Sequence, residues 1–175
     1  MFRLKVSRFR IPLSTAIAVA FLFLAEPTPA TLLAGLPLVI LGGGIRTWSS
    51  GYIRKNKELA VTGPYAYTRN PLYLGNFLIG LGFVIMLNRP VLVAVFLVVF
   101  GLVYRALIRE EEAVLSGKFG GAYEDYLKKV PRFFPRAGGT SESGDFSWGL
   151  VIRHQEYYAW LGMAGGLGWL LWKLQ

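Results

Sequence analysis

The chain has 175 residues, of which 54% are hydrophobic and only 17% are charged, so its composition points to lipid as the solvent of one domain of ordinary size. In so apolar a chain, the formal net charge of +9 is typical of basic residues that mark a cytoplasmic membrane face rather than a nucleic-acid surface. Because the sequence contains no cysteine, disulfides, thiolate metal sites and a cysteine nucleophile are excluded.

Five apolar runs predict an all-α, polytopic membrane protein with about five transmembrane helices. The runs cover residues 11–25, 30–49, 72–88, 90–108 and 157–172. The first run has the basic start of a signal peptide, but its cleavage site is weak and another apolar run follows at once. We therefore interpret it as a retained, short membrane helix. The short connections "EPTP" and "NRP" predict helical hairpins.

Basic residues predict the orientation in the membrane. They gather before the first run and in the segments 50–71 and 109–156, whereas the opposite side holds only Arg89 and Lys173. We expect an integral, multi-pass protein whose N-terminus and two long polar segments are cytosolic. Residues 1–136 form the predicted core, 137–147 a flexible linker, and 148–175 a C-terminal interfacial segment with the fifth helix.

The stretch "GPYAYTRNPLYLGN", residues 63–76, places rigid and polar residues at the mouth of the third run. Pro64 and Pro71 each fix φ and restrict the residue before them, so the segment is stiff. Its three tyrosines are also typical of an aromatic belt that anchors a protein at the membrane surface.

The stretch "REEEAVLSGKFGGAYEDYLKKVPRFFP", residues 109–135, begins with three glutamates after the fourth run. Charge runs usually form a solvated helix end. However, acidic residues are unfavourable at the C-terminus of a helix dipole, so we expect the fourth helix to continue beyond residue 108.

Together, and in this order, the two stretches resemble the isoprenylcysteine carboxyl methyltransferase and phospholipid methyltransferase superfamily over about residues 35–135. Its members are integral membrane enzymes that use S-adenosyl-L-methionine. The resemblance implies methyl transfer to a lipophilic acceptor, such as a prenyl-cysteine carboxylate, a phospholipid amine or a similar amphiphile. It implies a cytosolic cofactor-binding segment and a cytosolic active site, a membrane partner, no nucleic acid and no metal ligand.

The family's arginine-histidine-proline-x-tyrosine motif falls on Arg69, Asn70, Pro71 and Tyr73, so asparagine replaces the histidine. An asparagine does not transfer a proton near neutral pH, which places any base at this position in doubt. The resemblance implies as cofactor-binding residues Tyr65, Arg69, Asn70, Pro71, Tyr73, Glu111 and Glu112. It implies as catalytic residues Arg69, Glu112 and Arg132.

The chemistry of these residue types suits the cofactor. One of the paired glutamates can bind its ammonium or ribose hydroxyls, and Arg69 can bind its carboxylate. We expect "VPRFFP" to fold over the cofactor as a lid, with Arg132 as a second anion partner and Phe133, Phe134 or Tyr73 over the adenine. The pair Gly80 and Gly82 resembles a family glycine-x-glycine, although small residues in membrane helices usually serve packing.

Other interpretations remain open at the level of sequence. The chain is alternatively a catalytically silent membrane scaffold or a membrane reductase of the sterol reductase type. A small multidrug-type transporter is disfavoured, because no acidic residue lies in the middle of an apolar run. The single histidine, His154, is either a base or, as is commoner near an interface, a structural residue.

Overall fold

The computed structural model describes residues 23–54, 58–136 and 144–175, and within these ranges every regular element is helical. The elements are α2 (Pro29–Ser50), the 3₁₀ turn η1 (Gly63–Ala66), α3 (Pro71–Met86), α4 (Pro90–Phe119), α5 (Gly121–Lys129), α6 (Trp148–Arg153) and α7 (Tyr157–Trp172). The prediction of an all-α fold is confirmed for the described residues. The predicted helix over 11–25 and the predicted linker over 137–147 lie largely outside them.

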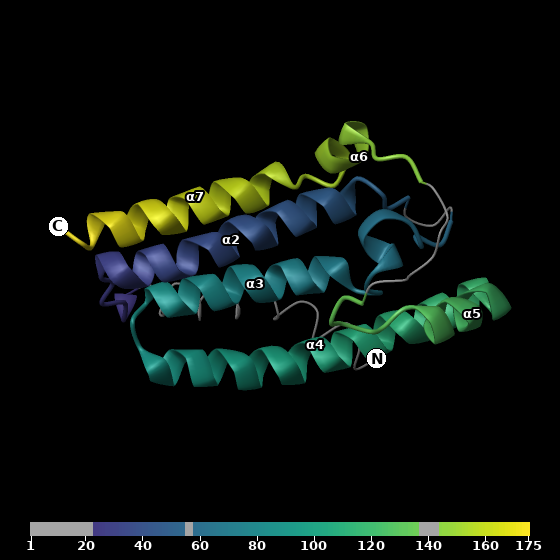
Figure 1. The fold of residues 1–175 in the computed structure, drawn as a ribbon, viewed down its shortest axis with the longest axis horizontal. Helices are drawn as coiled ribbons and strands as arrows, with labels where there is room; N and C mark the ends of the chain where they lie inside the picture. Colours follow the sequence, from purple (N-terminus) through teal and green to yellow (C-terminus); the bar gives the residue numbers. More distant parts are fainter. Residues whose placement is uncertain (1–22, 55–57, 137–143) are drawn as a thin grey trace, which may run out of the picture.

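Four long helices lie side by side, in the order α7, α2, α3 and α4 across the molecule (Figure 1). Successive helices alternate in direction, so the C-terminal ends of α2 and α4 and the N-terminal ends of α3 and α7 meet at one end of the bundle. The short elements α5 and α6 lie at that same end. The bundle therefore gathers both polar stretches of the sequence at one end.

Glycines allow α2 and α3 to pack with their backbones in contact, and this is the most extensive helix pair in the structure. A Cβ atom added at Gly82 would lie 2.7 Å from the carbonyl oxygen of Gly35, and one at Gly75 would lie 2.8 Å from that of Gly42. Small residues permit such close approach in membrane helices. Gly82 thus serves helix packing, whereas Gly80 faces the ring of Phe96 on α4.

The start of each long helix follows from local sequence. Pro29, Pro71 and Pro90 occupy the first positions of α2, α3 and α4, where the missing N–H has no helical partner to lose. Thr28 caps α2, because its side chain accepts from the Thr31 amide while the Thr31 hydroxyl accepts from the Thr28 amide.

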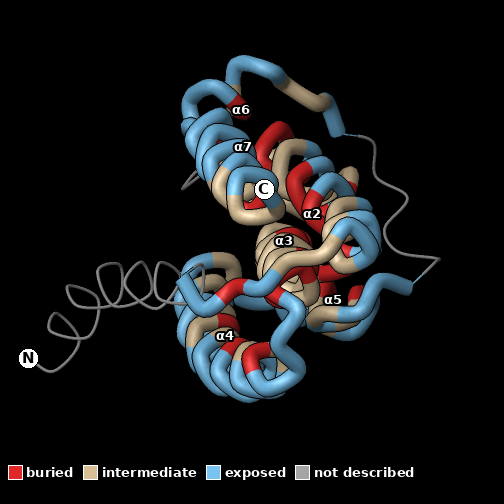
Figure 2. The backbone as a smooth tube through the Cα atoms, turned by 90° about the vertical axis from the view of Figure 1, so that its left-hand side faces the viewer, coloured by how far each residue is buried: buried red, intermediate tan, exposed pale blue. Residues whose placement is uncertain are grey.

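Helix α4 extends through Phe119, so the expectation that it continues beyond residue 108 is confirmed. Its apolar part is largely exposed (Figure 2), with side chains such as Val91, Val98 and Leu102 on the outside. A large exposed apolar face is typical of a lipid or protein contact.

Two described helices, α2 and α4, are long and apolar enough to cross a membrane. Helices α3 and α7 have 16 residues each, which at 1.5 Å per residue is about 24 Å, against roughly 30 Å of hydrocarbon. The described residues therefore support two full-length spans, where the sequence predicted about five.

Candidate active site

A cavity of about 430 Å³ lies at the end of the bundle where the polar stretches meet. Its wall comes from the chain after α2, the η1 turn, the start of α3, the end of α4 and α5. The lining residues include Leu59, Tyr65, Arg69, Asn70, Pro71, Tyr73, Glu111, Glu112, Lys118, Phe119, Tyr123 and Tyr126. All seven predicted cofactor-binding residues are thus brought to one cavity. Arg132, predicted as a catalytic residue, does not line the cavity but forms an ion pair with Glu112, which does.

The η1 turn delivers Tyr65 to this cavity. Gly63 adopts φ +58, and an added Cβ there would meet the ring of Tyr52. Glycine adopts such a backbone more readily than residues that carry a Cβ. Tyr65 is 8% exposed, and the Tyr126 hydroxyl donates to its carbonyl oxygen at 2.7 Å. The turn is therefore fixed against α5.

Glu112 lies at the centre of a charged network. One carboxylate oxygen is 2.9 Å from a terminal nitrogen of Arg69, and the Arg132 guanidinium donates to both oxygens at 3.0 and 2.8 Å. Arg69 and Glu112 side chains are 11% and 15% exposed, whereas that of Arg132 is 51% exposed. Because both oxygens bind arginines, Glu112 orients Arg69 in this arrangement.

The neighbouring Glu111 has a different environment. The Tyr73 hydroxyl donates to one of its oxygens at 2.8 Å, and both residues line the cavity. An ionised carboxylate has about four acceptor positions. Glu111 thus retains capacity to accept from a ligand.

The segment 130–136 folds back onto the start of α3, as the lid expectation requires. The Asn70 side-chain amide donates to the Arg132 carbonyl at 2.8 Å, and the Arg69 amide donates to that of Pro131 at 2.9 Å. Asn70 therefore holds the backbone of this segment. Its aromatic residues, however, do not line the cavity: Phe133 packs edge-on against Phe77 and lies near Phe100, and Phe134 is 76% exposed.

Among the residues that the structure describes, two donors of the cavity wall are buried without a hydrogen-bond partner, namely the Tyr65 hydroxyl and Nε of Arg69. A buried donor left without a hydrogen bond costs about 1–3 kcal/mol. Burial, followed by the charge of Glu111, raises the pKa of Tyr65 well above its usual value, so the hydroxyl keeps its proton. Both donors are therefore suited to an anionic ligand.

Sequence reasoning missed one buried ion pair. Arg46 on α2 donates to both oxygens of Glu156 at 3.0 Å and also to the Asn76 side chain. Glu156, just before α7, is 6% exposed. The signal was available, because an arginine inside an apolar run is itself unusual. The partner was not predictable, since it lies 110 residues further along the chain.

His154 has a structural environment. Its Nδ1 lies 3.0 Å from the carbonyl oxygen of Ser50, and it does not line the cavity described above. The structural interpretation of this histidine is therefore the one that the geometry favours.

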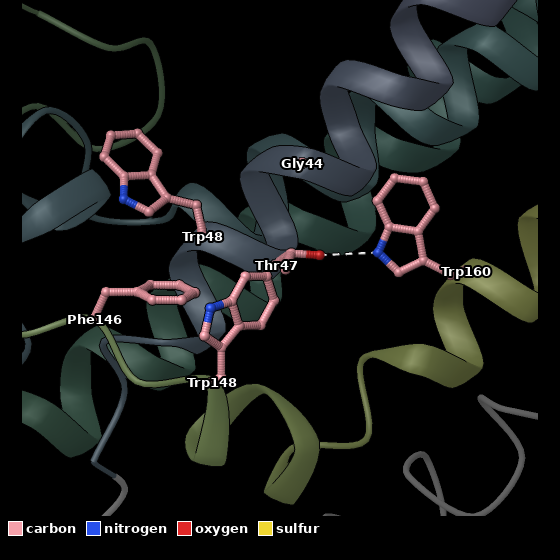
Figure 3. Close-up of a pocket in the computed structure, with 6 residues that line it drawn as sticks. All are labelled: Gly44, Thr47, Trp48, Phe146, Trp148 and Trp160. Atoms are coloured by element: carbon pink, nitrogen blue, oxygen red, sulfur yellow. Dashed lines mark hydrogen bonds between the residues drawn. The ribbon is translucent and has the colours of Figure 1, made fainter.

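A second, shallow hollow lies where α6 and α7 meet α2 (Figure 3). Aromatic rings surround it, and the indole N–H of Trp160 donates to the Thr47 hydroxyl at 2.9 Å. Its lining residues are Gly44, Thr47, Trp48, Phe146, Trp148 and Trp160. This wall is almost wholly apolar, whereas charged and polar side chains line the first cavity.

Comparison with known proteins places this geometry in a family. Residues 30–122, just over half of the chain, match the model of the phospholipid methyltransferase family. A nickel-cobalt-cadmium resistance protein of Alcaligenes xylosoxydans xylosoxydans is 40% identical over 111 residues, which are 61% of this chain and 51% of that protein. A cobalt-zinc-cadmium resistance protein of Cupriavidus metallidurans is 38% identical over 127 residues, 71% of this chain and 57% of that protein.

A protein-S-isoprenylcysteine O-methyltransferase of Schizosaccharomyces pombe is 39% identical over 84 residues, which are 47% of this chain and 36% of that protein. The chain spans about half the length of the first two relatives. No solved structure matches it significantly. The matched region runs from α2 into α5 and contains every predicted cofactor-binding residue, so the chain belongs to the phospholipid methyltransferase family.

Proposed function

We propose that the chain is a membrane methyltransferase that uses S-adenosyl-L-methionine to methylate a lipophilic acceptor at the cytosolic membrane face. Family membership supports the reaction class, and the relatives named as isoprenylcysteine O-methyltransferases support a lipophilic acceptor. The two apolar helices α2 and α4 support a membrane location. In this proposal the shorter helices also lie in the membrane, as parts of a multi-pass bundle whose N-terminus is cytosolic.

The observation that carries the proposal is the pair of buried donors without partners, the Tyr65 hydroxyl and Arg69 Nε. Both residues line a cavity whose volume falls in the roughly 300–1,000 Å³ range of small-molecule sites. The cofactor carries a carboxylate, and a charge-assisted hydrogen bond to an arginine is stronger than one between neutral groups. The residues present therefore fit this group.

The paired glutamates take different roles in this proposal. Glu111 lines the cavity and retains acceptor capacity beside Tyr73, so it binds the ammonium or the ribose hydroxyls. Glu112 binds Arg69 and Arg132, so it is a positioning residue for Arg69. This division refines the expectation that either glutamate contacts the cofactor.

When bound, the cofactor supplies an activated methyl group on a sulfonium. The chain then has to orient the two reactants and exclude water, which is the main requirement of an in-line displacement. Asn70 holds the Arg132 carbonyl and supplies no proton transfer, because an amide does not ionise near neutral pH. The start of α3 at Pro71 places Tyr73 on the cavity wall.

A row of aromatic side chains leads from the cavity along α3 and α4. Tyr73 in the cavity wall meets Tyr104 at 5.1 Å between ring centroids, Tyr104 stacks on Phe100 at 3.7 Å, and Phe100 meets Phe77 at 5.1 Å. Phe77 in turn stacks on Phe96. We place the acceptor tail along this row, with its polar head at the cavity.

Two relatives are named for metal resistance. The whole sequence holds one histidine and no cysteine, and no group of three or more metal-ligating side chains occurs among the residues the structure describes. Methyl transfer therefore has more support in this chain than metal binding.

The test is to incubate the purified chain in nanodiscs with methyl-labelled cofactor and a total lipid extract, and to identify the labelled product by mass spectrometry. Acceptors of one head group and increasing tail length then test the tail site. Each added methylene should contribute up to about 0.8 kcal/mol of burial until the row is filled. Equal rates from short, soluble acceptors to long ones would contradict a tail site and favour a small cytosolic substrate.

A further inference from the structure

The segment 144–160 attaches to the C-terminal end of α2 through several independent contacts. The Ser147 amide donates to the Gly51 carbonyl at 3.0 Å, and Nδ1 of His154 lies 3.0 Å from the Ser50 carbonyl. The Trp160 indole donates to Thr47 (Figure 3). The segment therefore contacts both ends of the last turn of α2 and the residue that follows it.

The strongest of these contacts is the ion pair between Arg46 and Glu156. It is bidentate and largely buried, and Arg46 also binds Asn76 on α3. Removing one partner of a buried pair leaves an uncompensated charge, which is far more costly than losing the pair as a whole. Through Arg46, Glu156 thus connects the start of α7 to α2 and, by way of Asn76, to α3.

A series of packing contacts connects this attachment point to the η1 turn, which carries Tyr65. The ring of Phe146 packs against Gly51 and lies 6.0 Å from that of Tyr52, and Tyr52 in turn packs on Gly63 at the start of η1. Gly144 contacts Thr62, the residue before η1. The contacts thus form a continuous series from the C-terminal segment to the turn that carries Tyr65.

We propose that residues 144–160 act as a brace for the cofactor cavity, with Glu156 as the positioning residue that holds Gly51, Tyr52 and the η1 turn, and hence Tyr65, in place. The brace lies beyond residues 30–122, which match the family. The inference rests on the proposed function, because the expected effect of the brace is tighter binding of the cofactor. Among the charges near Tyr65, those of Glu111 and Glu156 both raise its pKa, consistent with the closeness of the brace to the cavity.

Two substitutions break the brace at different points, and each has a matched control. Glu156→Gln removes the buried charge, whereas Glu26→Gln breaks an exposed ion pair with Arg89 near the α3–α4 turn, at the far end of the bundle. Gly51→Ala introduces a Cβ that overlaps the Phe146 ring, whereas a Cβ at Gly44 meets open space. Gly51 has φ −70, so alanine fits its backbone, and any effect arises from the displaced ring.

The measurements are hydrogen exchange of peptides within 58–66 and calorimetric titration with S-adenosylhomocysteine, both in nanodiscs. We expect Glu156→Gln and Gly51→Ala to speed exchange in 58–66 and to weaken binding by at least fivefold, with both controls within twofold of the parent. Unchanged exchange, or faster exchange with unchanged affinity, would overturn the proposal. If the parent failed to bind the probe, the proposed function would fail, while the exchange data would still report on the brace.

If Glu156→Gln does not fold, Gly51→Ala and its control Gly44→Ala carry the test, because both leave the ion pair between Arg46 and Glu156 intact. Unchanged exchange in 58–66 and unchanged affinity in a folded Gly51→Ala variant would then overturn the proposal.

Discussion

Replacing Glu112 by glutamine tests the arrangement of the cavity most sharply. The substitution keeps the size of the side chain and removes the charge that binds Arg69 at 2.9 Å and Arg132 at 2.8 Å. The Arg132 side chain is half exposed, so solvent screens its pair and it contributes little. The loss of binding therefore comes mainly from the contact between Glu112 and Arg69, whose side chains are both largely buried.

A hydrogen bond to a charged group is worth about 1.5–3 kcal/mol, which corresponds to roughly a 10- to 150-fold change in affinity. Because Glu112 acts by orienting Arg69, we expect Glu112→Gln to weaken binding of S-adenosylhomocysteine by about this factor, measured by calorimetry in nanodiscs. Glu110→Gln is the matched control, since residue 110 adjoins the pair but does not line the cavity. Equal effects at 110 and 112 would refute the reasoning and would indicate that these glutamates only form a solvated helix face.

Three further predictions follow from packing, ionisation and topology. Gly82→Ala should lower the free energy of unfolding by about 1–3 kcal/mol in a chemical denaturation series, because its Cβ would meet backbone of α2; Gly101→Ala, which meets open space, should leave it unchanged. Burial raises the pKa of Tyr126 above its usual value, so the stability from this tyrosine is fully present below pH ~10 and declines as pH rises beyond it, by up to about 1.4 kcal/mol per pH unit. Unfolding between pH 8 and 11.5 should therefore show a smaller alkaline decline in Tyr126→Phe than in the parent, and identical slopes would argue against a buried neutral phenol. A cysteine introduced at Asn88, in the exposed turn between α3 and α4, should react with a membrane-impermeant thiol reagent only from outside, and one at Glu124 in α5 only from the cytosol; the reverse pattern would invert the proposed topology.

The sequence predicted the parts of the fold that depend on local pattern. Apolar runs fixed the positions of α2, α3, α4 and α7, and the unfavourable placement of glutamates at a helix end correctly indicated that α4 continues. The spacing of two stiff, polar stretches around one hairpin brought their side chains to the same end of the bundle.

The remainder depends on contacts between distant parts of the chain. Arg46 stands out as an arginine inside an apolar run, but its partner Glu156 lies 110 residues away and only tertiary packing pairs them. In the same way, local pattern did not show that Phe133 packs beside Phe77 rather than in the cavity, or that Glu112 binds two arginines. Side-chain direction within an irregular segment follows from its neighbours in space, which periodicity does not describe.

The central claim is that the cavity between η1, α3 and α4 is the cofactor site. It is tested most directly by ultraviolet cross-linking of radiolabelled S-adenosyl-L-methionine to the purified chain in nanodiscs, followed by peptide mapping. The account predicts label in peptides within 58–73 or 111–126, which is lost when excess S-adenosylhomocysteine is present. Label confined to 144–172, or label that excess S-adenosylhomocysteine does not remove, would contradict it.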